Sequence, residues 1–164
     1  MTRSSLRLAT ILLFTGTAGT LAAQDTSQLL ATCLAGDPAA CLKTAPKLAI
    51  GDGIAADPDR AGRLLLLACD LGVASGCTLL GQWLAQGSFL DPDPSRAAGM
   101  FRRACEGGDG AGCDEAARAY ESGAGVIGNM ELAARFAAAG CDHQALRACL
   151  RLGEWLERGQ GIHT

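Results

Sequence analysis

The stretch Cys69-Asp-Leu-Gly-Val-Ala-Ser-Gly-Cys77 contains a spacing that the rest of the chain repeats. Its two cysteines are 8 residues apart, and pairs with the same separation recur every 36 residues along the sequence. Together they account for all 8 cysteines of the 164-residue chain: Cys33/Cys41, Cys69/Cys77, Cys105/Cys113 and Cys141/Cys149. A strict period of this length indicates a repeat protein, in which one structural unit is stacked several times.

Other residues recur with the same period and predict where the helices lie. Residues such as Leu80, Gly81 and Leu84 follow the i, i+1, i+4 pattern of one buried helical face. A glycine that suits a left-handed C-cap follows each such stripe, and it is always at the same place in the unit: Gly51, Gly87, Gly123 and Gly159. We predict that the first helix of each unit spans about 39–50, 75–86, 111–122 and 147–158.

The second helix of each unit has its own start signal. Asp57-Pro58, Asp93-Pro94 and Asn129 supply N-cap oxygens, twice with proline at the first helical position. They predict second helices at about 58–71, 94–107 and 130–142, with a further one at about 26–35. Two antiparallel helices per unit predict an all-α, right-handed α/α solenoid. Its helix pairs span about 38–72, 74–108 and 110–144, with a partial unit at 146–162.

The N-terminal segment, residues 1–23, has the pattern of a secretory signal peptide. Two arginines precede a short apolar run, Leu8–Phe14, and a zone of small residues follows at Thr20–Ala23. A permanent membrane anchor is the alternative, but it needs roughly 20 apolar residues and threonines and glycines interrupt this run. We therefore expect residues 24–164 to form a secreted or periplasmic repeat domain that has no membrane contact after cleavage.

Composition and charge narrow the choice of partner. Hydrophobic residues make up 49% of the chain but aromatic residues only 4%, so its core must come from close contacts between slim, alanine-rich helices. The formal net charge is −3, and lysine and arginine are scattered along the sequence. The sequence contains no run of basic residues, so it does not predict a nucleic-acid partner.

Two longer stretches carry a resemblance to a known family. Ala116-Ala-Arg-Ala-Tyr-Glu-Ser-Gly-Ala-Gly-Val126 and Leu152-Gly-Glu-Trp-Leu-Glu-Arg-Gly-Gln-Gly-Ile162 resemble the core of the Sel1-like repeat, a longer relative of the tetratricopeptide repeat. The cysteine spacing resembles the secreted, cysteine-rich branch of that family. The resemblance covers about residues 26–162. It also raises an enzyme hypothesis, because some members of this branch bind penicillin and are classed as β-lactamases.

The cysteine spacing favours four local disulfides. Cysteines 36 residues apart would lie on equivalent helices of neighbouring units, about 8–10 Å apart, which exceeds the limit of about 7 Å between the Cα atoms of a disulfide. Cysteines 8 residues apart lie at the end of one helix and the start of the next antiparallel one. Zinc ligands usually come as C-x2-4-C and redox pairs as C-x-x-C. We therefore expect structural disulfides, no metal and no cofactor.

The sequence contains no recognisable catalytic motif. A serine β-lactamase needs a serine and a lysine spaced as S-x-x-K, and neither Lys43 nor Lys47 lies three residues after a serine. We assign no catalytic residue. A weak β-lactam-binding hydrolase remains the alternative function, implied by the resemblance alone.

A binding function is predicted from the shape of a solenoid. The first helices line its concave surface, so their non-core positions face any groove. One such position is occupied in turn by Lys47, Trp83, Ala119 and Trp155. The sharpest candidates for contact with a protein or peptide partner, whose identity the sequence does not give, are Trp83, Arg118, Trp155 and Arg158. The alternative for both tryptophans is that they pack between neighbouring units.

Overall fold

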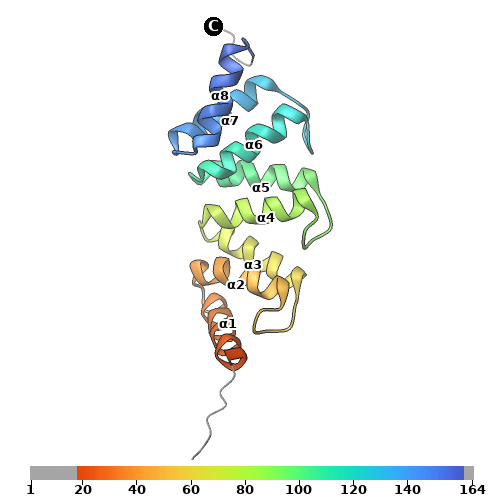
Figure 1. Ribbon diagram of the computed structural model, residues 1–164, viewed down its shortest axis with the longest axis vertical. Helices are drawn as coiled ribbons and strands as arrows, with labels where there is room; N and C mark the ends of the chain where they lie inside the picture. Colours follow the sequence, from red (N-terminus) through yellow and green to blue (C-terminus); the bar gives the residue numbers. More distant parts are fainter. Residues whose placement is uncertain (1–17, 161–164) are drawn as a thin grey trace, which may run out of the picture.

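The computed structural model describes residues 18–160, which form eight α-helices and, within this range, no strand. The helices stack one above another along the long axis of the molecule (Figure 1). In order they are α1 (Ala18–Leu34), α2 (Pro38–Ile50), α3 (Pro58–Asp70), α4 (Ala74–Gln86), α5 (Pro94–Glu106), α6 (Gly110–Ser122), α7 (Met130–Asp142) and α8 (Leu146–Glu157). The predicted all-α solenoid is confirmed, and α2 to α8 lie within one residue of their expected bounds.

Helix α1 is longer than the sequence predicts. It begins at Ala18 rather than near residue 26, so residues 18–23 of the expected signal peptide belong to this helix. Alanine and leucine in this segment favour helix. The remainder of the expected signal peptide, residues 1–17, lies outside the described residues, as do residues 161–164. None of the helices in the described part of the chain combines the length and the apolarity that a membrane crossing needs.

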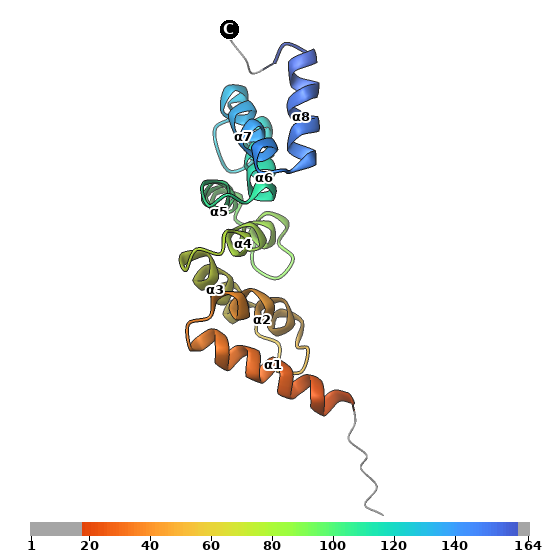
Figure 2. The same cartoon turned by 90° about the vertical axis from the view of Figure 1, so that its left-hand side faces the viewer.

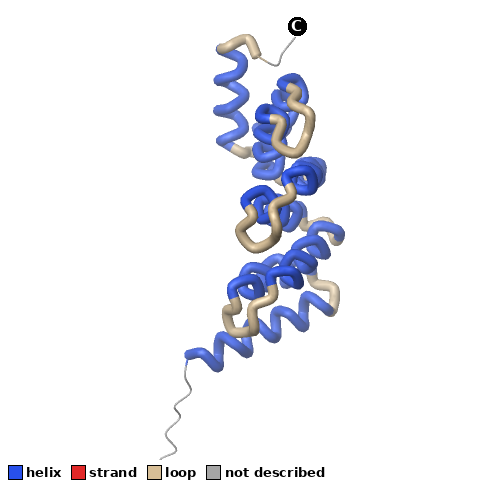
Figure 3. Tube along the Cα trace, turned by 90° about the vertical axis from the view of Figure 1, so that its right-hand side faces the viewer, coloured by secondary structure: helices blue, strands red, loops and turns tan. Residues whose placement is uncertain are grey.

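The helices form two layers. Seen from the side, α2, α4, α6 and α8 lie toward one face of the stack and α3, α5 and α7 toward the other (Figure 2). We call the first of these the first-helix face. The longer loops, residues 51–57, 87–93 and 123–129, lie along one edge of the stack (Figure 3).

The helix ends follow the signals in the sequence. Asp57 Oδ1 accepts a hydrogen bond from Arg60 N at 2.9 Å, and Asp93 and Asn129 cap α5 and α7 in the same way. Gly51, with φ 80°, occupies the left-handed region that favours glycine, and the equivalent glycines after α4 and α6 do the same. The loops on this edge are therefore fixed by local chemistry at both ends.

Four disulfides join each second helix to the first helix that follows it. The bridges are Cys33–Cys41, Cys69–Cys77, Cys105–Cys113 and Cys141–Cys149, with Cα–Cα distances of 4.4–4.8 Å. They are the four local pairs that the spacing favours. Each bridge clamps a tight turn on the edge opposite the long loops.

The hydrophobic core has a seam near the middle of the stack. One large cluster runs from α1 through α5 and ends at Ala116 of α6. A second, smaller cluster contains Ala117, three alanines of α7 and Trp155 of α8. The seam runs through α6, because its Ala116 belongs to the large cluster and its Ala117 to the small one.

Candidate binding site

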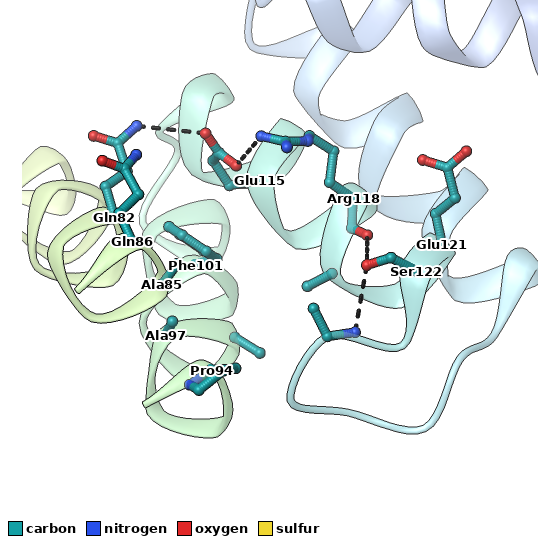
Figure 4. A pocket seen from close by; sticks show the side chains of 13 residues that line it. Gln82, Ala85, Gln86, Pro94, Ala97, Phe101, Glu115, Arg118, Glu121 and Ser122 are labelled. Atoms are coloured by element: carbon teal, nitrogen blue, oxygen red, sulfur yellow. Dashed lines mark hydrogen bonds and ion pairs between the residues drawn. The ribbon is translucent and has the colours of Figure 1, made fainter. Parts of the chain in front are cut away.

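A cavity of about 450 Å³ opens on the first-helix face between α4, α5 and α6. Figure 4 shows Gln82 and Gln86 on one side, Arg118 and Ser122 on the other, and Phe101 and Ala97 between them. Its lining consists of Gln82, Ala85 and Gln86 of α4, Pro94, Ala97, Ala98 and Phe101 of α5, Glu115, Arg118, Ala119, Glu121 and Ser122 of α6, and Ala124 of the following loop.

The floor of the cavity is apolar. Ala97, Ala98 and Phe101 of α5 are all 4% exposed or less. Phe101 lies where it does because of Gly81: a Cβ atom at Gly81 would lie 2.6 Å from Cε1 of the Phe101 ring. The ring thus packs toward α4 and leaves the space above the two alanines open.

The rim of the cavity is polar and includes Arg118, one of the predicted contact residues. Arg118 Nη1 donates to Glu115 Oε2 at 2.9 Å, and Gln82 Nε2 donates to the other carboxylate oxygen at 3.5 Å. The side chain of Arg118 is 56% exposed, against 20% for Glu115. Most donors of the guanidinium therefore remain accessible to solvent or to a partner. An apolar floor under a polar rim is typical of sites that bind ligands or peptides.

The two tryptophans are buried, which corrects their choice as exposed contact residues. Trp83 is 5% exposed and packs within the large cluster, where its ring lies 4.7 Å from that of Phe89. Trp155 is 2% exposed and packs in the small cluster. The physical reason is that packing an indole in these apolar clusters removes its large surface from water. The sequence left open the alternative that both tryptophans are packed inside the protein, and the structure shows this arrangement.

Trp155 belongs to a polar network that docks α8 on α6. Its Nε1 donates to Glu121 Oε1 at 3.2 Å, and the guanidinium of Arg151 lies 5.8 Å from the indole centroid. Arg151 also donates from Nε to the buried carboxylate of Asp114 at 2.9 Å and from Nη1 to Glu121 at 3.3 Å. This network holds the last described helix in place.

Of the four predicted contact residues, the cavity contains only Arg118. Arg158 is exposed but follows the end of α8, outside the cavity. The rim residues Gln86, Glu115 and Ser122 lie at non-core positions of the first helices, where the repeat pattern predicts contact with a groove. Gln86 and Ser122 occupy equivalent positions in successive units, a signal that was present in the repeat pattern.

Two observations concern groups that a hydrolase could use. Lys47 Nζ lies 3.3 Å from Asp25 and 3.6 Å from Asp52, which engage it in ion pairs. Between residues 18 and 160, no group of three or more His, Cys, Asp or Glu residues is placed to hold a metal ion.

The fold and the disulfides define an α/α-solenoid repeat protein. The family model of the Sel1 repeat matches residues 38–73, 74–109, 111–143 and 146–163. The chain therefore belongs to the Sel1 repeat family. No curated protein matches the chain.

Solved structures show the same fold at low sequence identity. A Sel1 repeat protein from Oxalobacter formigenes has a TM-score of 0.74 at 22% identity, over 85% of this chain and 57% of that one. A protective antigen of uropathogenic Escherichia coli with an SLR fold has a TM-score of 0.78 at 23% identity, over 86% of this chain and 30% of that one. Cysteine-rich protein B of Helicobacter pylori has a TM-score of 0.64 at 22% identity, over 82% of this chain and 96% of that one. This chain thus spans less than two thirds of the first two proteins.

Proposed function

We propose that this protein is an extracytoplasmic scaffold that binds a protein or peptide partner through its first-helix face. The observation that carries the proposal is the cavity between α4, α5 and α6, which combines an apolar floor with an exposed arginine on its rim. Solenoids use such extended faces for recognition.

The disulfides support a location outside the cytoplasm. Disulfides form and persist in oxidising compartments and are rare in the cytosol, and here four of them recur once per unit. Together with the signal-peptide pattern of residues 1–23, they favour a secreted or periplasmic protein.

A peptide library displayed on phage tests the binding function. We expect the immobilised protein to enrich peptides, and we expect Arg118→Glu to weaken their binding at least fivefold, which corresponds to about 1 kcal/mol. The reason is that the exposed guanidinium of Arg118 is the one cationic group among the residues that line the cavity, whose other charged groups are the carboxylates of Glu115 and Glu121. Fluorescence anisotropy of the enriched peptides gives the dissociation constants.

The matched control is Arg135→Glu, a charge reversal at an exposed arginine of α7 in the opposite layer. It should bind the selected peptides as the parent does. Failure to enrich any peptide, or equal binding by the Arg118 and Arg135 variants, would contradict the proposal.

A further inference from the structure

The cavity lies where the stack lacks an aromatic ring. Trp83, Ala119 and Trp155 recur at 36-residue intervals and occupy the same position on α4, α6 and α8. Trp83 and Trp155 are 5% and 2% exposed, and Trp155 packs with Ala117 of α6 and with alanines of α7, in the preceding unit. At the junction between the second and third units a methyl group takes the place of the indole, and the cavity of about 450 Å³ lies there.

Two residues of the cavity match residues around a buried tryptophan elsewhere in the chain. Trp155 packs in one cluster with three alanines of α7, namely Ala133, Ala134 and Ala137. The residues 36 positions earlier line the cavity: Ala97, Ala98 and Phe101. Two other positions differ: Phe101 takes the place of Ala137, and Ala85 of α4 takes the place of Glu121, the acceptor for the indole N–H of Trp155.

We propose that this cavity binds a tryptophan side chain of the partner, which completes between two molecules the contact that Trp83 and Trp155 make within the chain. This rests on the proposed function and names the chemistry of the partner. A tryptophan buries about 150–250 Å² of surface, and buried aromatic anchors carry much of the binding energy of interfaces. The volume of the cavity lies within the range of about 300–1,000 Å³ for ligand sites.

The rim supplies an acceptor for the indole N–H. Ala85 cannot play the part that Glu121 plays for Trp155, but the neighbouring Gln86 lines the cavity. Its Oε1 accepts one hydrogen bond from Ser88 Oγ at 3.1 Å, and an amide oxygen has two lone pairs. A second acceptor site is therefore available, which favours an indole over a purely aliphatic side chain.

Two capped peptides test the proposal on the unmodified protein. We expect acetyl-Gly-Trp-Gly-amide to bind at least about tenfold more tightly than acetyl-Gly-Leu-Gly-amide, a difference of about one unit in log Kd. Titration of isotope-labelled protein followed by NMR should shift the backbone amides of Gln86, Ala97 and Ala119. Equal affinities, or shifts that map outside the cavity, would overturn the proposal.

Filling the cavity from within gives the complementary test. Ala119→Trp should raise the Tm by about 2 °C or more, because an indole now packs as at Trp83 and Trp155, and should abolish the shifts caused by the tryptophan peptide. Ala111→Trp, at an exposed position in the first turn of α6, is the control and should leave both Tm and binding unchanged. Should Ala119→Trp fail to fold, Ala119→Leu fills part of the same space and must weaken the tryptophan peptide; unchanged binding overturns the proposal.

The outcomes separate this inference from the proposed function. Suppose that the selected library peptides depend on Arg118, contain no tryptophan and bind the Ala119→Trp variant normally. That result would support the proposed scaffold function and reject the indole site. Binding of the tryptophan peptide in the cavity without any enriched library peptide would support the site alone.

Discussion

Single residues decide how tightly each unit packs. The small position of the first helices is Ala45, Gly81, Ala117 and Gly153 in successive units. At Gly81 the absence of a side chain admits the ring of Phe101, whereas a Cβ atom at Gly153 would have nothing within 4 Å. The same residue type therefore has two different effects on packing, depending on what the next helix presents.

Alanine substitutions at these two glycines should change stability in opposite directions. We expect Gly81→Ala to lower the free energy of unfolding by about 1–2 kcal/mol, because the new methyl group forces the buried Phe101 ring to shift. Gly153→Ala should raise it by about 0.5–1 kcal/mol, because alanine favours helix and meets no neighbour.

Urea denaturation followed by circular dichroism gives both values. If both variants change stability in the same direction and by similar amounts, the contact between Gly81 and Phe101 has no energetic role.

Among the elements, α8 depends most on polar contacts. Leu156 is 51% exposed, whereas the equivalent Leu48 and Leu84 are 1% and 2% exposed. The helix packs on α6 and α7 through one face only, with Trp155 as its large buried side chain. The network of Asp114, Glu121 and Arg151 therefore adds to a small apolar contact.

Removing the charge of Arg151 should loosen α8. Arg151→Met leaves the Asp114 carboxylate, whose side chain is 9% exposed, without its 2.9 Å partner. We expect a loss of about 2 kcal/mol in the free energy of unfolding. The emission of Trp155 should shift to the red in a Trp83→Phe background, which isolates the signal of that residue.

The control is Arg118→Met, which breaks an ion pair whose arginine is mostly exposed and should cost less than about 1 kcal/mol. Equal losses in the two variants would mean that the burial of Asp114 is without consequence.

At the scale of the whole molecule, the repeat made the fold predictable from the sequence. The cysteine, glycine and cap positions recur with one period, so the bounds of α2 to α8 followed from local chemistry. The cavity did not follow, because it results from a missing side chain. Ala119 occupies the same position of the repeat as the two tryptophans. Only the contacts of those tryptophans in the structure show that this position lies in the packed interior.

The four disulfides should dominate thermal stability and should not be equally reducible. Each small ring contributes about 2 kcal/mol by loop entropy, so full reduction should lower the Tm by at least about 10 °C. Cys141 and Cys149 are both partly exposed, whereas Cys33 and Cys41 are 0% exposed. We therefore expect dithiothreitol to open Cys141–Cys149 first and Cys33–Cys41 late.

Partial reduction, alkylation and peptide mapping by mass spectrometry give the order, and calorimetry gives the Tm. If the reduced and the oxidised protein have the same Tm, helix packing alone holds the stack together.

The open space between α4, α5 and α6 makes the packing of the stack uneven along its length. A densely packed interior resists deformation, so we expect the stack to bend most easily where α4 and α6 enclose open space. A side chain inserted there acts as a wedge at the most pliable joint. We expect the size of that side chain to set the curvature of the stack, so that a partner that contacts only two units would change the direction in which both ends point.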